Sequence, residues 1–333
     1  MTNKQLAETF VFMKEEALPL RYKPLAGEST AMRNRSRKDL ADTIHYEEGK
    51  DYIVDYEEGT IRRANGSRIP DGSLHPMYGV SEFDHNRYSD FSNQAYTVYL
   101  DYSTESMTED RSLTTEDIDR SGLLRRLVGK LEAGEEAVYV VYGDSISTGG
   151  EASEEGLAYF GRIRDTLLNL YKEGRIRIVN KAIGGEDTSG GVRRVASDVV
   201  PLNADLVSIG YGMNDQNKQA DGHTTTLEDF EKNLRFMIDT IRNAGDSDIL
   251  LVTPCEPNPN WQHTSGKTAL YADVIRRLGD EYGIGVLDAH ATWAAELAAG
   301  KTHESLLLNN INHPNDYGHW IYSKALSPML KKR

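Results

Sequence analysis

Several features that would narrow the protein's class are scarce or missing in this chain of 333 residues. It has one cysteine, Cys255, which excludes an intramolecular disulfide and any metal site built from several cysteines. Its net charge of -14 argues against nucleic acid as a partner, because phosphate contacts need clustered basic side chains. No window approaches the roughly 18 consecutive apolar residues of a membrane span. The first 20 residues also lack the unbroken apolar stretch of a secretory signal. We therefore expect a cytoplasmic protein that binds neither nucleic acid nor membrane.

Metal-binding patterns are missing as well. The acidic residues show no EF-hand spacing, and the nine histidines show no His-Glu-x-x-His spacing. We therefore expect no metal and no other cofactor. Hydrophobic residues make up 38% of the chain and charged residues 27%, which is typical of a soluble globular protein. The length is sufficient for two domains.

From about Ala137 onward, short apolar runs alternate with stretches of helical period. Such runs, rich in Val, Ile and Leu, are typical of strands buried on both faces. Strands that alternate with helices predict a parallel sheet covered by helices on both faces. In one helix, Thr225 and Glu228 have the spacing of a capping box, and Gly245 follows as a stop. The predicted strands are 137–143, 175–179, 205–210, 248–253 and 284–288, and the predicted helices are 154–173, 227–241 and 267–282.

The first 110 or so residues have a different pattern. Residues 51–103 contain alternating, Tyr-rich runs broken by turn signals, which predicts a small antiparallel β module. The basic cluster that begins at Arg33 is interpreted as solvated surface. Residues 114–134 predict one connecting helix that ends near Gly134. We place a mainly-β accessory domain with its connecting helix at residues 1–125, and an α/β domain at residues 126–333.

Two motifs with catalytic potential follow the first two predicted strands. Gly143-Asp144-Ser145 follows the first strand, where a serine at a strand-to-helix turn presents its Oγ at the top of the sheet. A helix after it would offer N–H groups and a partial positive charge to a developing anion. Gly184-Gly185 follows the second strand, where a glycine lets the backbone approach a substrate closely. Alone, each motif also fits an ordinary turn.

Two further motifs lie nearer the carboxyl end. Asn214 follows the third strand, and an amide at a strand's end can donate to an oxyanion. It also fits a residue that caps or fills a loop. His313 stands in a loop that leads into the last helix, where it could accept a proton from Ser145 and return it to a leaving alcohol. A lone histidine is more often structural.

Together the four motifs resemble those of the SGNH (GDSL-type) hydrolase family over roughly residues 130–333. The resemblance implies a three-layer α/β/α fold preceded here by a small mainly-β domain, as in two-domain carbohydrate esterases. It also implies a serine esterase in which Ser145 attacks an ester carbonyl and His313 is the general base. The Ser145 and Gly185 N–H groups and the Asn214 amide would then form the oxyanion hole, and Asp144 would contact substrate.

The chain departs from the family at two places. The family usually has an Asp three residues before its catalytic His, and here that residue is Asn310. The enzyme could be a Ser145–His313 dyad whose ring Asn310 or a backbone carbonyl orients, or another carboxylate, Asp316 or Asp288, could act. Alternatively, the site could be impaired and the protein only bind its ligand. The family also often has a Gly where this chain has Ala182. In the same loop, the extra Glu186 before Asp187-Thr188 leaves the choice between the two glycines open.

The substrate class is less constrained by these motifs. No long apolar lid segment appears, which favours a short acyl group such as acetyl. The β module resembles the accessory domains of two-domain carbohydrate esterases, which favours a carbohydrate as the alcohol partner. The Tyr-rich β module could contact sugar, or it could serve structure or a contact between copies of the chain. Trp261 follows the fourth strand and could line the acyl or sugar pocket, or it could belong to a loop stiffened by prolines. An acyltransferase and a noncatalytic binding protein on the same fold remain alternatives.

Overall fold

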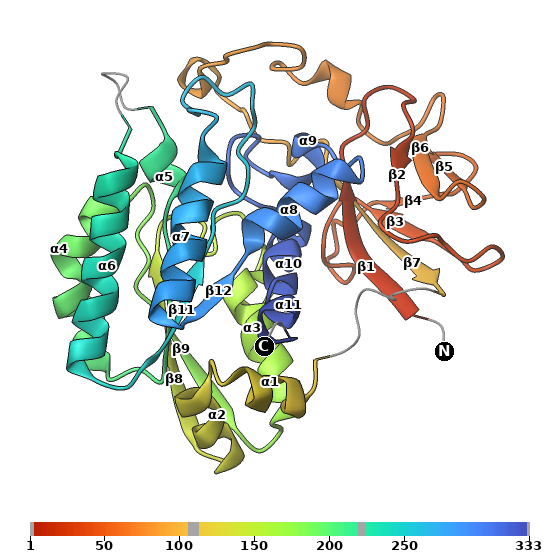
Figure 1. The fold of residues 1–333 in the computed structure, drawn as a ribbon. Helices are drawn as coiled ribbons and strands as arrows, with labels where there is room; N and C mark the ends of the chain where they lie inside the picture. The colour runs from red at the N-terminus through yellow and green to blue at the C-terminus, as the bar shows by residue number, and fades with distance from the viewer. Residues whose placement is uncertain (1–2, 106–112, 219–223, 332–333) are drawn as a thin grey trace. The chain divides into compact units, whose positions relative to one another are not determined.

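The computed structural model describes residues 3–105, 113–218 and 224–331 (Figure 1). Its contacts divide the chain into two compact units. The N-terminal unit takes residues 1–111, 257–262 and 294–318, as far as they are described. The parallel-sheet unit takes residues 112–256, 263–293 and 319–333, with the same restriction. Two segments from the carboxyl-terminal part of the chain therefore belong to the N-terminal unit. The domain boundary at residues 125/126 stays a prediction.

The parallel-sheet unit is built on five parallel strands in the order β12-β11-β10-β8-β9. All five predicted strands are confirmed, with every end within one residue of its predicted position. The apolar runs of β8, β10 and β11 are buried on both faces, whereas the edge strand β9 is partly exposed. The strands are β8 (Glu136–Gly143), β9 (Arg175–Asn180), β10 (Leu206–Gly210), β11 (Asp248–Val252) and β12 (Gly285–Leu287).

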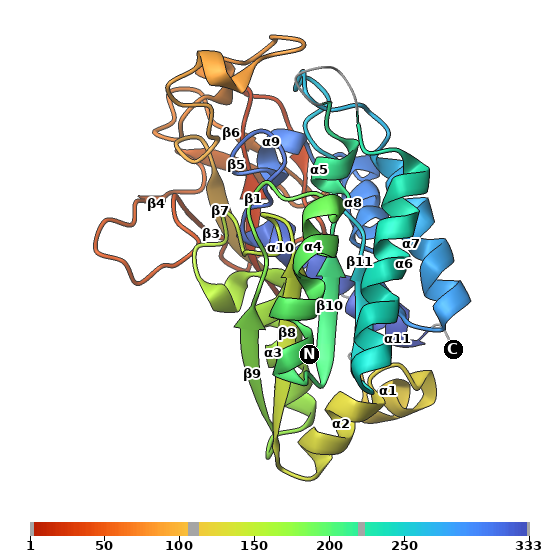
Figure 2. The same cartoon turned by 90° about the vertical axis from the view of Figure 1, so that its left-hand side faces the viewer.

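Helices cover both faces of this sheet, which makes the three layers α/β/α. Helices α4 (Thr188–Asp198), α6 (Leu227–Ala244) and α7 (Thr268–Tyr282) cover one face of the sheet (Figure 2). They share one apolar core with alternate strand residues such as Val140 and Val207. Helix α3 (Tyr159–Leu170) packs against β9, and α11 (Leu326–Lys331) packs against β12. Alternation along β12 separates the two faces. A side chain at Gly285 would meet Met329 of α11, whereas Val286 faces Gly279 of α7.

The remaining helices are short. They are α1 (Thr115–Ser121), α2 (Arg125–Glu132), α5 (Met213–Gln216), α8 (Ala289–Ala298), α9 (His303–Leu306) and α10 (Asp316–Lys324). Among the described residues, no helix is both long and apolar enough to cross a lipid bilayer.

Three sequence-based details of the helices were wrong. The predicted connecting helix over 114–134 is two helices, α1 and α2, because Gly122 adopts the left-handed conformation that ends α1. The helix predicted over 154–173 is a short 3-10 turn followed by α3. Helix α6 is capped by Thr226, whose side chain accepts from the N–H of Asp229, and not by Thr225.

The N-terminal unit contains two antiparallel sheets, of order β1-β7-β3-β4 and β2-β6-β5, which confirms the predicted β module. Its first strand, β1, was not predicted: it buries Glu8 and carries a bulge with Ala7 at a positive φ, so its alternation is broken. The strands are β1 (Asn3–Phe10), β2 (Leu18–Pro19), β3 (Ala31–Arg33), β4 (His45–Tyr46), β5 (Tyr52–Asp55), β6 (Thr60–Arg63) and β7 (Val98–Thr104).

Ionic and polar groups lie inside this unit as well as apolar ones. The Lys301 ammonium is 2.6 Å from the Glu8 carboxylate, and both side chains are almost fully buried. Arg33, which was interpreted as solvated, is buried and forms an ion pair of 3.0 Å with Asp101. The interpretation of Arg33 was wrong because its partner lies far away in sequence, on β7.

Candidate active site

Ser145 lies just beyond the carboxyl end of β8, in a turn that depends on close approach of the backbone. A Cβ atom on Gly143 would lie 2.2 Å from the carbonyl oxygen of Gly210, so only glycine fits there. The Asp144 N–H donates to the same carbonyl at 3.0 Å. Ser145 itself is 9% exposed. The neighbouring strand β10 therefore fixes the start of the turn.

No regular helix begins directly after Ser145, contrary to the sequence-based expectation. Residues 144–151 form successive turns, and the first α-helix to follow is α3. A helix dipole therefore does not supply the positive potential at Ser145. Any donors to a developing anion must come from individual N–H groups of the turn and of neighbouring loops.

The Asp144 carboxylate lies beneath this turn and is buried. It accepts a hydrogen bond of 3.0 Å from the N–H of Ile146. Burial is the largest influence on this group and raises the pKa of Asp144 to about 7. The carboxylate thus bonds to the turn's own backbone, and a contact of Asp144 with substrate stays a prediction.

The glycine pair lies in the loop between β9 and α4. A Cβ atom on Gly184 would lie 3.9 Å from the Cβ of Ser145, which places this glycine beside the serine. Gly185 has φ +76, a conformation that favours glycine, and has open space around its Cα. Among the described residues, the N–H groups of Gly184 and Gly185 donate no hydrogen bond. Both are therefore available to an oxyanion, and the choice between them stays open.

Asn214 lies on α5, after the end of β10, and is tied to the glycine loop. Its Nδ2 donates to the carbonyl oxygen of Glu186 at 3.0 Å. This bond uses one of the two amide hydrogens and fixes the orientation of the amide group. The serine, glycine and asparagine motifs are thus joined at the carboxyl ends of β8, β9 and β10.

The extra residue of the glycine loop, Glu186, has structural partners of its own. Its carboxylate forms an ion pair with Arg194 of α4 and accepts a hydrogen bond of 2.7 Å from the Tyr211 hydroxyl. The Arg194 guanidinium also lies 4.2 Å from the centre of the Tyr142 ring. The side chain of Glu186 therefore anchors the loop to α4, while its backbone carbonyl accepts the hydrogen bond from Asn214.

Asp215 supports the same region from the interior. It is fully buried, its Oδ1 accepts hydrogen bonds from the N–H and Oγ1 of Thr188 at 3.1 and 2.5 Å, and its Oδ2 accepts from the N–H of Gly212 at 3.1 Å. Burial raises the pKa of Asp215 to about 6 despite these donors. Its carboxyl group links α4 to α5 beneath the Asn214 side chain.

His313 and Asn310 belong to the N-terminal unit, whereas Ser145, Gly184, Gly185 and Asn214 belong to the parallel-sheet unit. We call residues 307–314 the His313 loop. A bridge between Leu307 and Pro314 closes this loop, and the Leu308 N–H donates to the His313 carbonyl at 2.9 Å.

Asn309 organises the inside of the His313 loop. Its Oδ1 accepts from the N–H groups of Ile311, Asn312 and His313 at 3.0, 3.0 and 2.8 Å. Sequence reasoning missed this residue. The run of asparagines around His313 was the available signal, since Asn side chains commonly bond to the backbone of nearby residues.

Asn310 is buried, with φ +59, and its side chain faces two other asparagines. Its Oδ1 accepts from Asn93 Nδ2 at 3.2 Å and from Asn258 Nδ2 at 3.0 Å. This oxygen therefore already has two donors within the N-terminal unit. The role of Asn310 in orienting the His313 ring stays a prediction.

Of the two alternative carboxylates, Asp288 has other partners. It forms an ion pair of 2.8 Å with Arg276 and accepts a hydrogen bond from the Ala291 N–H at the start of α8. Burial raises the pKa of Asp288, but the bond to Arg276 and its charge lower it, and the pKa is lowered overall. Asp316 is the first residue of α10 and is buried.

Trp261 is 7% exposed and packs in a small cluster with Met77, Phe83 and Ile311. Its indole N–H donates to His85 Nδ1 at 3.1 Å. The ring therefore belongs to the interior of the N-terminal unit, and its contact with an acyl group or sugar stays a prediction.

A cavity of about 460 Å³ in the parallel-sheet unit lies away from these motifs. It is lined by parts of β12, α7 and α11, and none of the motif residues contributes to it. Its charged lining residues are Arg276, Asp280 and Asp288, and Arg276 pairs with Asp288 and with Asp273. We do not assign substrate to this cavity.

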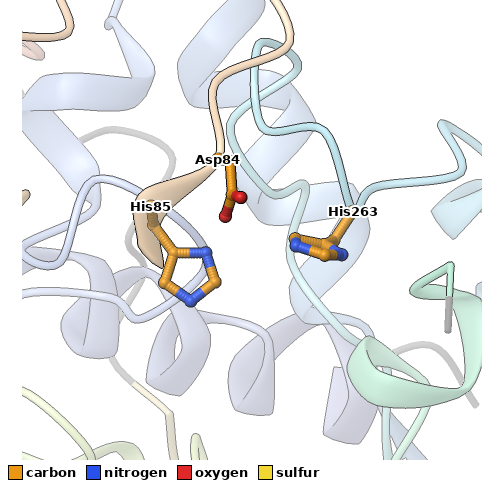
Figure 3. A group of neighbouring side chains, drawn as sticks. All are labelled: Asp84, His85 and His263. Atoms are coloured by element: carbon orange, nitrogen blue, oxygen red, sulfur yellow. The ribbon is translucent and has the colours of Figure 1, made fainter. Parts of the chain in front are cut away.

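Figure 3 shows Asp84, His85 and His263, three side chains of types that bind metal ions. Asp84 and His85 belong to the N-terminal unit and His263 to the parallel-sheet unit. We assign no metal site to them.

The serine, glycine and asparagine at the ends of parallel strands define a class of esterase, and the comparison with known families agrees. Residues 141–321, more than half of the chain, match the model of the GDSL-like lipase/acylhydrolase family. The chain belongs to this family and is a carboxylic ester hydrolase. Residues 1–140 lie outside the matched region.

Among individual proteins, the chain is similar to an acetylxylan esterase of Geobacillus stearothermophilus. The two are 28% identical over 210 residues, which cover 59% of this chain and 94% of the relative. A solved structure of a variant of Axe2, an acetyl-xylooligosaccharide esterase of Geobacillus, has a TM-score of 0.50 and 26% identity, and covers 60% of this chain and 96% of that chain. The structure of Axe2 from Geobacillus stearothermophilus gives 26% identity, the same coverage and a TM-score of 0.49.

Proposed function

We propose that this protein removes short acyl groups, above all acetyl, from a carbohydrate by a serine mechanism. The observation that carries the proposal is the joining of Ser145, the glycine loop and Asn214 at the ends of three adjacent parallel strands. The similarity to acetylxylan esterase supports an acetylated sugar as substrate. The substrate is thus a small molecule or an oligosaccharide, and the reaction needs no cofactor.

In this mechanism the Ser145 Oγ attacks the ester carbonyl while His313 accepts the hydroxyl proton. The negative charge that forms on the carbonyl oxygen is stabilised by N–H groups of Ser145 and of Gly184 or Gly185 and by the second hydrogen of the Asn214 amide. His313 then returns the proton to the leaving sugar oxygen, and an acyl-enzyme remains. Water, deprotonated by the same histidine, releases acetate and restores Ser145.

Support for Asn214 as an oxyanion donor comes from its fixed orientation. An amide held by the Glu186 carbonyl does not need to reorganise when charge develops, and preorganised donors of this kind are worth about 3–4 kcal/mol each. For His313, the support is the order of the motifs and the membership in the family.

The test compares acetate release from p-nitrophenyl acetate and from acetylated xylo-oligosaccharides by wild type and by Ser145→Ala. Removing the nucleophile should lower kcat by about 10⁴-fold or more with the fold intact. Ser147→Ala is the matched control, because Ser147 lies in the same turn but its Oγ bonds to the Tyr159 hydroxyl at 3.0 Å. Turnover that survives in Ser145→Ala would refute the serine mechanism. Hydrolysis of the simple ester but of no acetylated sugar would refute the substrate class.

A further inference from the structure

The His313 loop is held by a residue from a distant part of the N-terminal unit. Asn93, which is 1% exposed, lies in the segment before β7. Its N–H donates to the Leu308 carbonyl at 2.7 Å, and its Nδ2 donates to the Leu307 carbonyl at 2.8 Å and to Asn310 Oδ1 at 3.2 Å. Through its side chain and its backbone, Asn93 thus binds three residues of the loop.

A second asparagine binds the same loop from another segment. The N–H of Asn258 donates to the Ile311 carbonyl at 2.7 Å, and its Nδ2 lies 3.0 Å from both the carbonyl oxygen and the Oδ1 of Asn310. Asn310 is the shared acceptor of Asn93 and Asn258. Its positive φ is maintained by these buried bonds, since a non-glycine residue rarely adopts this conformation without support.

The chemistry of these contacts requires an amide at position 93. Its Nδ2 faces carbonyl oxygens, which only accept, so an aspartate there would place oxygen against oxygen. The bound residues lie directly beside His313 in the loop, because the Leu308 N–H donates to the His313 carbonyl and Asn309 accepts from the His313 N–H. A displacement at Leu307, Leu308 or Asn310 would therefore move the backbone of His313.

We propose that Asn93 is a positioning residue for the general base. Through the His313 loop, it makes the N-terminal unit part of the catalytic machinery and not a detachable sugar-binding accessory. This inference rests on the proposed role of His313 as the base. Because reacting groups must be placed to within a fraction of an ångström, a shift of about 1 Å in the base costs on the order of a hundredfold in rate.

The experiment measures kcat and KM for p-nitrophenyl acetate with full-length Asn93→Asp and Asn93→Ala, well below their melting temperatures. Rates are expressed per Ser145 that can be titrated with a fluorophosphonate. We expect kcat to fall by about 10- to 100-fold in Asn93→Asp and less in Asn93→Ala, with KM nearly unchanged. The same two changes at Asn65, an exposed residue of the N-terminal unit, are the matched controls and should leave kcat as in wild type.

If Asn93 only stabilises the fold, its variants will melt earlier but keep the wild-type kcat per titrated serine, and that result would overturn the inference. Should Asn93→Asp fail to fold, Asn93→Ala decides by the same criterion. The failure of the proposed function is a separate result: activity of the wild type would then not depend on Ser145 or His313, and the role of Asn93 would fall with it.

Discussion

The interactions that stabilise the interior of the parallel-sheet unit differ from those inside the N-terminal unit. In the parallel-sheet unit, alternate residues of β8, β10 and β11 meet α4, α6 and α7 in one continuous apolar core. The N-terminal unit has an apolar core between its sheets and a small apolar cluster around Trp261 as well, and its three chain segments are also joined by buried polar contacts. These include the Glu8–Lys301 ion pair and the bonds from Asn93 and Asn258 to the His313 loop.

The difference matters for the way each unit supports chemistry. An apolar core tolerates many combinations of hydrophobic residues of similar total volume. Such a core stabilises the sheet, and the residues at the strand ends can therefore serve function. Hydrogen bonds between buried polar groups are directional, and each lost partner leaves another group unsatisfied. The loop of residues 307–314 buries the apolar side chains of Leu307, Leu308 and Ile311, and directional bonds in addition define its irregular backbone.

The largest effect should come from breaking the buried ion pair of the N-terminal unit. Lys301→Met leaves the Glu8 carboxylate buried without its counter-charge, and such changes cost about 3–5 kcal/mol. Burial also lowers the pKa of Lys301, so the pair already bears a desolvation cost. We expect this loss in the free energy of unfolding, measured by urea denaturation.

Arg37→Ala is the control for Lys301→Met, because it breaks the exposed pair of Arg37 with Asp39. Exposed pairs contribute about 0–1 kcal/mol. The double variant Glu8→Gln/Lys301→Met should recover part of the loss, since no unpaired charge remains. If Lys301→Met cost no more than Arg37→Ala, the contrast between the two units would not hold.

An intermediate effect is expected from pH in the parallel-sheet unit. The pKa of Asp144 is about 7 in the folded protein, above the usual 3.8, so the folded state binds this proton more tightly than the unfolded chain does. Its contribution to stability is therefore full below pH 3.8 and is lost as the pH rises through about 7. Asp144→Asn removes this titration, on the order of a few kcal/mol.

The corresponding measurement is the difference in melting temperature between Asp144→Asn and wild type from pH 4 to 8. This difference should shift in favour of the variant as the pH rises and should become constant above about pH 7. Ser147→Ala, which changes the same turn without removing an ionisable group, is the control and should show no such trend. A pH-independent difference for Asp144→Asn would mean that this carboxyl is not desolvated in solution.

The smallest effect should come from Asn310→Asp. A carboxylate at this position still accepts from Asn93 and Asn258, so the His313 loop should keep its conformation. The dyad hypothesis then predicts a kcat within about threefold of wild type, or higher, because a carboxylate stabilises an imidazolium.

A large loss of activity in Asn310→Asp, with an unchanged melting temperature, would contradict this expectation. It would show that the amide nitrogen of Asn310 has a role of its own in the reaction. The isosteric change Asn309→Asp serves as a comparison in the same loop: it keeps the acceptor for three backbone N–H groups but loses the bond from Asn309 Nδ2 to Asn312 Oδ1 at 3.2 Å.

The contrast between the units also explains how much the sequence could predict. The buried strands leave continuous apolar runs and the edge strand β9 leaves an alternating one, so all five strands of the parallel sheet could be predicted. With them, the place of Ser145 and Asn214 at strand ends could be predicted. Strand β1 escaped prediction because it buries Glu8 and bulges at Ala7. Asn93 and Asn258 escaped because a bond between asparagines more than fifty residues apart leaves no period in the sequence.

Because the N-terminal unit is assembled from both ends of the chain, its formation has a time order. The Thr9 hydroxyl donates to the Ser305 carbonyl at 2.6 Å, across 296 residues of sequence. At a synthesis rate of about 5–20 residues per second, strand β1 leaves the ribosome roughly 15–60 s before that acceptor exists. The amino-terminal strands must wait, partly unpaired, while the parallel sheet is already complete. Chaperones would have their longest opportunity to bind the nascent enzyme at this stage, and the His313 loop would be among the last parts to reach its native conformation.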